Sequence, residues 1–142
     1  MDGLKIGVEV KLAARTIIIG GVIINASAPV HLKDNKTLMV PVRAIAEHMV
    51  GAQNIGWDKD KQQVTVTVGA KKAIMHLNHK LLTLEDTLTG SFEQKTMEVA
   101  PYERDGVTFL PFRVLGEEIL GLPRENISWD ENTKTAYFNN IK

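Results

Sequence analysis

The 142-residue chain has no cysteine, which excludes disulfides, thiolate zinc sites, iron–sulfur clusters and cysteine nucleophiles. It has no excess charge of either sign, because 17 basic and 17 acidic side chains cancel. This balance disfavours a nucleic-acid or anionic-membrane partner, so we expect neither. The sequence contains no apolar run of roughly 18 residues and does not begin with a signal-peptide pattern. We therefore expect a chain without membrane insertion, from which any leader is absent.

The sequence also lacks the common catalytic motifs GxSxG, SxxK, GxGxxG and the Walker loop. Its four histidines are His31, His48, His76 and His79, and none belongs to an HExxH motif. His76 and His79 flank an expected turn, but no third ligand follows at a telling spacing. We predict no catalytic residue, no cofactor and no metal site, and the sequence leaves open whether a single histidine binds metal.

An internal repeat is the strongest positive feature of the sequence. Residues 38–58 and 108–130 share a series of identities in the same order, at separations of 70 and then 72 residues. The series includes Pro41 and Pro111, Arg43 and Arg113, Glu47 and Glu117, Gly51 and Gly121, Ile55 and Ile127, Trp57 and Trp129, and Asp58 and Asp130. This series predicts two copies of one unit.

Each copy has apolar residues at helical spacing. They are Val42, Ile45, Ala46, Met49 and Val50 in the first copy, and Phe112, Leu115, Gly116, Ile119 and Leu120 in the second. Pro41 and Pro111 suit a helix start, and Gly51 and Gly121 suit a left-handed stop. The pattern predicts two amphipathic helices of about three turns each.

Alternating apolar residues around these helices predict antiparallel strands. Gly20-Gly21 and Asn78-His79 fit two-residue hairpin turns, and a strand follows each Trp-Asp pair. Residues 6–10 predict one further strand. We expect a first copy over residues 1–69 and a second over 70–142, packed as one unit. The polar segment 85–98 is expected to be an inserted surface loop in which Phe92 is a candidate ligand-binding or interaction residue.

The motif Thr37-Leu38-Met39-Val40-Pro41-Val42-Arg43, followed by Ile45-Ala46-Glu47, Gly51 and Trp57-Asp58, resembles the copper amine oxidase N-terminal domain-like modules of Gram-positive surface and secreted proteins. The second copy, from Asp105 through Trp129-Asp130, is comparably similar. The resemblance implies an α+β fold with antiparallel sheets curled around amphipathic helices. It also implies a stalk remote from copper and quinone chemistry, so it predicts no activity.

We assign structural roles to the repeated signature residues. Arg43 and Arg113 are expected to be partly buried and to bind backbone carbonyls or the Trp-Asp turn, because an isolated surface pair with Glu47 or Glu117 contributes little. Trp57 and Trp129 are expected in the core, with exposure for sugar stacking as the alternative. Asp58 and Asp130 are expected to cap the amides of the following turn.

These observations favour a non-catalytic spacer, anchor or adhesion module at the cell surface or outside the cell, and not an enzyme. Its expected partners are other protein domains or cell-wall components. One alternative is a glycan-binding module that uses Phe92 or an exposed tryptophan. Another is self-assembly through the apolar strands around residues 17–24, because free strand edges can pair with a neighbour.

Overall fold

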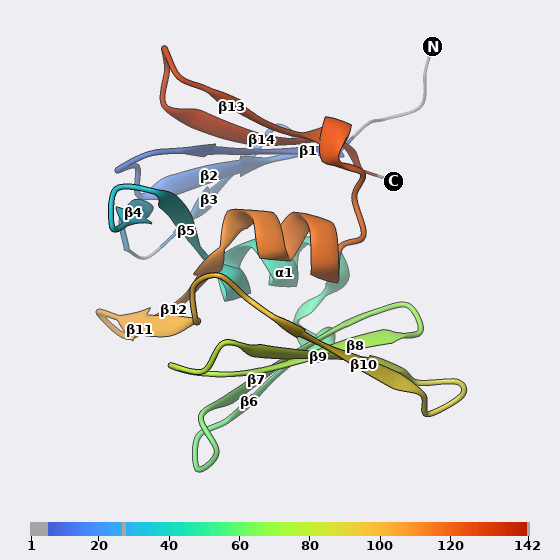
Figure 1. Cartoon of the computed structure of the whole chain (residues 1–142). Coiled ribbons are helices and arrows are strands. Elements are labelled where there is room, and N and C mark those ends of the chain that lie inside the picture. Colours follow the sequence, from blue (N-terminus) through green and yellow to red (C-terminus); the bar gives the residue numbers. More distant parts are fainter. Residues whose placement is uncertain (1–5, 27, 142) are drawn as a thin grey trace.

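Antiparallel sheets make up most of the structure, a computed structural model that describes residues 6–26 and 28–141. Two five-stranded sheets lie on either side of a pair of helices (Figure 1). Sheet 1 has the order β13 (Ile127–Asp130), β14 (Thr135–Ile141), β1 (Ile6–Lys11), β2 (Thr16–Ile19) and β3 (Val22–Asn25). Sheet 2 has the order β10 (Phe92–Thr96), β9 (Leu81–Asp86), β8 (Lys71–His76), β7 (Gln63–Val68) and β6 (Ile55–Asp58). The sheet-rich α+β class expected from the sequence is confirmed.

A smaller third sheet joins the two helical segments. Its order is β11 (Tyr102–Arg104), β12 (Val107–Pro111), β5 (Thr37–Pro41) and β4 (His31–Lys33). Helix α1 (Val42–Val50) continues directly from β5, and the helical segment that contains η2 (Val114–Ile119) follows β12. Short 3₁₀ turns, η1 (Ala52–Asn54) and η3 (Arg124–Asn126), connect these helices to β6 and β13.

Each of these sheets combines strands from residues 1–69 with strands from residues 70–142. The main core is also shared, since Val8, Ile45 and Val66 pack in one cluster with Leu115 and Phe138. Residues 1–5 and 142, which belong to the two expected copies, lie outside the described residues. Within the described chain, neither segment forms its sheets alone.

The two halves pair symmetrically at the centre of the molecule. Strand β5 pairs with β12 in the register Val40 with Leu110, Pro41 with Phe109, and Met39 with Pro111. Val40 and Leu110 are themselves equivalent in the repeat, so exchanging the two halves leaves this pairing unchanged. The order β13-β14-β1-β2-β3 likewise becomes β6-β7-β8-β9-β10 when the halves are exchanged. The strands are therefore arranged about an approximate two-fold axis.

Several local predictions are confirmed. Gly20 and Gly21 form the β2–β3 turn with φ values of 57° and 83°, conformations that glycine adopts without steric cost. Residues 6–10 form most of β1. Helix α1 buries Val42, Ile45 and Ala46 and stops at Gly51, whose φ is 90°.

The prediction that residues 85–98 form a surface loop was wrong. Strand β9 continues to Asp86, and β10 pairs with it from Phe92 opposite Glu85 to Thr96 opposite Leu81. The Asp86 carboxylate accepts the amides of Leu88 at 2.9 Å and Thr89 at 3.3 Å and closes the turn. All five side chains of β10 are exposed at the sheet edge, so the segment lacks the apolar alternation that identifies strands.

The second helix also differs from its expected form. Its predicted apolar stripe is buried at Phe112, Leu115, Gly116 and Ile119, but Val114–Ile119 forms a π-helix. The Leu120 amide donates to the Leu115 carbonyl at 2.9 Å, five residues earlier. The wider turn lies over Phe138, whose ring stacks on Phe112 at 3.9 Å between centroids. Apolar spacing alone does not distinguish this helix from an α-helix.

Candidate functional site

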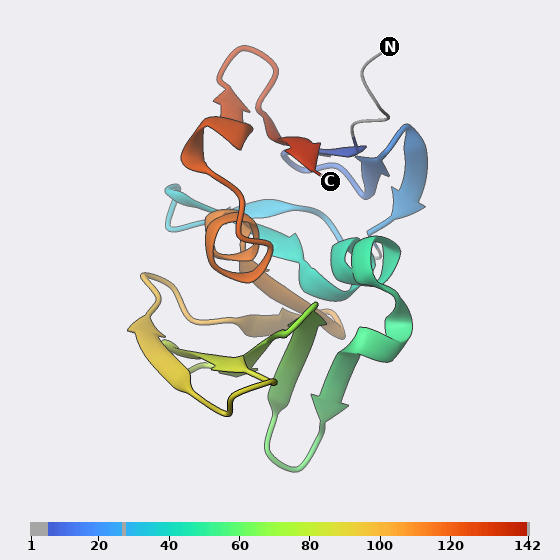
Figure 2. The ribbon, with the colours of Figure 1, turned by 90° about the vertical axis from the view of Figure 1, so that its right-hand side faces the viewer.

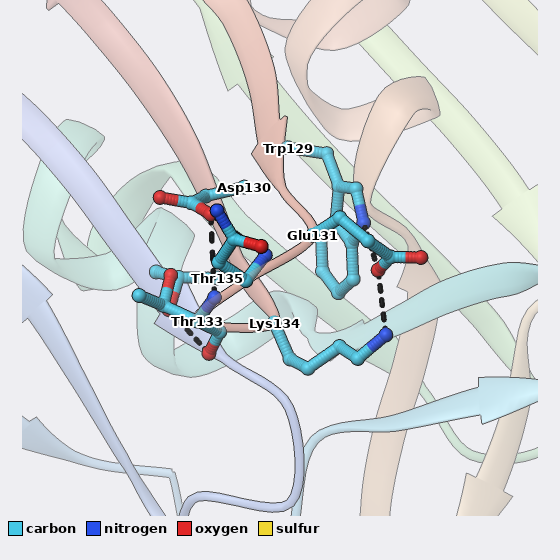
Figure 3. Close-up of polar contacts among 7 residues, drawn as sticks. Trp129, Asp130, Glu131, Thr133, Lys134 and Thr135 are labelled. Carbon is cyan, nitrogen blue, oxygen red and sulfur yellow. Dashed lines mark hydrogen bonds and ion pairs between the residues drawn. The ribbon is translucent and has the colours of Figure 1, made fainter.

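The Trp-Asp pairs end strands β6 and β13 and initiate similar turns. The Asp58 carboxylate accepts the amides of Asp60 and Lys61 at 3.1 and 3.2 Å. The Asp130 carboxylate accepts those of Asn132 and Thr133 at 2.9 and 3.2 Å (Figure 3). Both aspartates therefore cap their turns, as the sequence predicted.

The expected burial of Arg43 and Arg113 was wrong. Their side chains are 63% and 68% exposed. The Arg43 Nε lies 2.7 Å from a Glu47 oxygen, and the Arg113 Nε lies 3.7 Å from a Glu117 oxygen. Arg43 lies outside the buried stripe of α1 and faces solvent. Its guanidinium therefore contacts the Glu47 carboxylate one turn later and does not reach the interior.

The prediction that both tryptophans lie in the core was also wrong. Trp57 is 43% exposed and Trp129 is 41% exposed. They stand opposite the buried residues Val64 and Ala136 and so share the inward faces of their sheets. However, β6 and β13 are edge strands, so no further strand covers the outer side of either indole.

A groove adjoins each tryptophan. Groove 1, of about 620 Å³, is lined by residues that include Pro41, Arg43, Glu47, Ile55, Trp57 and Val64. Groove 2, of about 1040 Å³, is lined by residues that include Pro111, Arg113, Glu117, Ile127, Trp129 and Ala136. These two sets are equivalent one by one in the repeat. The two grooves thus represent the same site in the two halves.

The opposite half completes each groove. The β11–β12 hairpin contributes Gly106, Val107 and Thr108 to groove 1. The β4–β5 hairpin contributes the equivalent Lys36, Thr37 and Leu38 to groove 2. Each groove therefore depends on the association of both halves.

Charged side chains around groove 2 are paired with one another. Ion pairs join Lys36 to Glu98 at 2.9 Å, Lys95 to Glu118 at 2.7 Å, Arg124 to Glu117 at 3.1 Å and Lys134 to Glu131 at 2.6 Å. The hydrogen bond from Lys36 holds the pKa of the Glu98 carboxyl below its usual value. The bond to Glu118 raises the pKa of Lys95. The lowered pKa of Glu98 and the raised pKa of Lys95 both favour the ionised form of the side chain.

The Trp129 indole has a hydrogen-bond partner, Glu131, for which the first half has no equivalent residue. Its Nε1 donates to the Glu131 carboxylate at 3.1 Å, and Lys134 binds the same oxygen (Figure 3). Hydrogen bonds from Lys134 and then Trp129 lower the pKa of Glu131. The position equivalent to Glu131 is occupied by Lys59 in the first half, which cannot accept an indole N–H.

A second polar contact joins β4 and β11, the two edge strands of the third sheet, which are equivalent in the repeat. The His31 ring binds the Pro29 carbonyl at 3.0 Å through Nδ1 and the Tyr102 hydroxyl through Nε2. Burial raises the pKa of Tyr102. The His31 ring also meets Phe109 edge to face at a centroid distance of 4.6 Å, so these contacts belong to the packing of sheet 3.

The profile of the copper amine oxidase N-terminal domain matches residues 18–138 of the chain. The chain belongs to this family. Neither a search of curated proteins nor a search of solved structures found a match. The family comprises the non-catalytic N-terminal domain of copper amine oxidases, which supports the expectation of a structural module.

The described residues of this family member provide no cluster that fits a copper site. Within residues 6–26 and 28–141, no group of three or more His, Cys, Asp or Glu side chains is placed to hold a metal ion. The rings of His76 and His79 lie 6.4 Å apart, and the two ring nitrogens of His31 bind Pro29 and Tyr102. In the same part of the chain, no helix is long and apolar enough to cross a membrane.

The sequence did not predict the grooves, although the repeat indicates that any site formed by its residues in one half should recur in the other. Phe92, the candidate interaction residue, lies on β10 with 65% of its surface exposed and does not line either groove. The spacing of proline, arginine, glutamate and tryptophan is repeated in both copies, and in each copy these side chains lie around one groove. The sequence could not reveal that the opposite half supplies the facing wall.

Proposed function

We propose that the chain is a non-catalytic structural and interaction module of an extracellular or cell-surface protein. The observation that carries the proposal is that several of the repeated signature residues act in the fold itself. Asp58 and Asp130 cap turns, and Gly51 ends α1. Membership of a non-catalytic domain family adds further support.

The resemblance to modules of Gram-positive surface and secreted proteins supports an extracellular or cell-surface location. We also propose that the two halves arose by internal duplication. The series of ordered identities and the symmetric pairing of β5 with β12 support this origin. Other protein domains or cell-wall components are the proposed partners.

The proposal is tested by assaying the chain for hydrogen peroxide release from primary amines, with and without added copper. We expect no turnover above a buffer control, together with one cooperative thermal transition. Copper-dependent turnover would overturn the non-catalytic assignment. Trypsin treatment of intact source cells should release peptides of this chain if the proposed location is correct.

Self-association through β3 is a second candidate function. This strand lies at the edge of sheet 1, where Val22 and Ile23 are 50% and 68% exposed. An apolar edge strand favours pairing with a second copy. Sedimentation of the wild type and Ile23→Lys should reveal a concentration-dependent dimer that the substitution removes. A strict monomer at high concentration would refute this second function.

A further inference from the structure

The two grooves place their tryptophans in the same setting on different faces of the molecule. Residues of α1 and β6 line groove 1, and residues of η2 and β13 line groove 2. The α1–β6 segment and the η2–β13 segment lie on opposite sides of the ribbon (Figure 2). A ligand in one groove would therefore leave the other accessible. The chain therefore carries two grooves that each present one tryptophan.

Each indole offers a flat apolar surface within a groove of mixed polarity. More than half of Trp57 and of Trp129 is covered by protein, and the remaining 43% and 41% is exposed. An arginine and a glutamate line the groove beside each indole, at Arg43 and Glu47 or at Arg113 and Glu117. Their planar groups offer hydrogen-bond donors and acceptors next to an aromatic face.

The formal charges nearly cancel in both grooves: groove 2 is lined by five cationic and four anionic side chains, and groove 1 by Arg43, Glu47 and Glu103. This balance disfavours a highly charged ligand. The nine ionisable side chains that line groove 2 all take part in ion pairs with one another. They are Lys36, Lys95, Glu98, Arg113, Glu117, Glu118, Arg124, Glu131 and Lys134. A polyanion or polycation would have to compete with these pairs, whereas hydroxyl groups can bond to paired ions without separating them.

We propose that each groove binds an uncharged polysaccharide by stacking a pyranose ring on Trp57 or Trp129. The C–H groups on one face of a pyranose carry partial positive charge and complement the negative face of an indole. The flanking Arg–Glu pair then bonds to the sugar hydroxyls. This inference rests on the proposed role as an interaction module and names its ligand class. Because the sites are duplicated, one chain bridges two glycan strands.

The arrangement of aromatic side chains favours a sugar over a proline-rich peptide. Grooves that bind polyproline helices are lined by several aromatic side chains. Among the described residues that line groove 1, Trp57 is the only Phe, Tyr or Trp, and in groove 2 the second aromatic residue, Phe112, is buried. A single platform surrounded by planar polar groups suits one stacked ring with hydroxyls at its rim.

Because the chain has two tryptophans, two conservative variants separate the sites. Trp129→Phe leaves Trp57 as the fluorophore, and Trp57→Phe leaves Trp129. Each variant is titrated with cellohexaose, chitohexaose and maltohexaose, and with decaproline as the competing ligand class. We expect a saturable emission shift with at least one hexaose in both variants and none with decaproline. No shift with any hexaose, a response in one variant only, or saturation by decaproline would overturn the proposal.

Bridging is tested with beads that carry the hexaose that binds. The wild type should aggregate the beads, whereas Trp57→Ala and Trp129→Ala should each bind beads without aggregating them. The double variant should not bind, and Phe92→Ala is the matched control because its exposed ring lies outside both grooves. Unchanged aggregation by either single variant would overturn the bridging. If an alanine variant does not fold, the corresponding phenylalanine variant is used, with an expected loss of aggregation of at least about threefold. Failure of these assays leaves the amine-turnover test of the proposed function unaffected.

Discussion

The two halves of the molecule present the same signature residues on helices that are packed differently. In the first half the buried residues Ala46 on α1 and Val66 on β7 correspond to Gly116 in η2 and Phe138 on β14 in the second half. A Cβ added at Gly116 would lie 2.5 Å from the Phe138 ring and 2.9 Å from Ile127. The larger ring is therefore accommodated by the loss of a methyl group above it. The two helices therefore pack against the shared core in different ways, although the same signature residues line both grooves.

The largest expected effect comes from separating the halves. Fragments 1–69 and 70–142 should each be largely unfolded alone, because every described sheet needs strands from both. An equimolar mixture should recover strand content, since the missing partners are then supplied. Far-UV circular dichroism and amide NMR spectra check this result. Cooperative unfolding of either isolated fragment would show that the halves are independent.

The next effect concerns the different packing beneath the helices. Gly116→Ala should lower the free energy of unfolding by about 1–3 kcal/mol, because its Cβ overlaps the Phe138 ring. Adding Phe138→Val recreates the first-half combination and should recover part of this loss through a coupling of about 0.5–3 kcal/mol. Urea unfolding of both single variants and of the double variant measures this coupling free energy.

Ala46→Gly is the matched change in the first half. It should cost about 1 kcal/mol through helix propensity, plus a contribution from the lost methyl group. Adding Val66→Phe should recover part of this loss, because the two changes together recreate the second-half combination. Additive effects of Gly116→Ala and Phe138→Val would contradict the proposed complementarity.

A smaller effect should distinguish the two arginine–glutamate pairs. Arg43→Ala should lower stability by at most about 0.5 kcal/mol, because the 2.7 Å pair with Glu47 is exposed. Arg113→Ala should cost less, since its nitrogen lies 3.7 Å from Glu117 and Arg124 remains bound to that carboxylate. Urea titrations at low and high salt measure the two losses, and salt should reduce both. A cost of several kcal/mol for either variant would instead indicate a buried role.

The smallest effect is spectroscopic and concerns the Trp129 indole. Its partner Glu131 has a lowered pKa in the folded chain, so the carboxylate stays ionised below the usual range for glutamate. The contact is complete above the ordinary pKa and is lost as the pH falls through the lowered one. In Trp57→Phe, Trp129 emission should change in this acidic window. In Trp129→Phe, the emission of Trp57 should not change in this window, because Lys59 occupies the position equivalent to Glu131. Equal responses would contradict the assignment to Glu131.

Local patterns predicted the parts of the fold whose partners are near in sequence. The stripe from Val42 to Val50, the Gly20-Gly21 turn and the Asp58 cap all depend on neighbours within a few residues. Strand β10 escaped prediction because its five side chains are exposed, so burial left no alternation in its sequence.

Burial at the site could not be predicted in the same way. Tryptophan usually lies in the interior, and the strands that carry Trp57 and Trp129 have buried neighbours. Their exposure follows from the place of β6 and β13 at the edges of two sheets. In sheet 1 that place depends on pairing between residues far apart in the chain, such as Val10 with Ala136.

The sequence by itself determined the repeat, the α+β class, the two amphipathic segments and the turns that follow each Trp-Asp pair. These features depend on side-chain periodicity and on backbone preferences, which act over short distances. Only the tertiary structure decided which half supplies each strand, how η2 adapts to Phe138, and that two equivalent grooves form at the sheet edges. These outcomes depend on the mutual packing of the halves, because the facing wall of each groove comes from the other half.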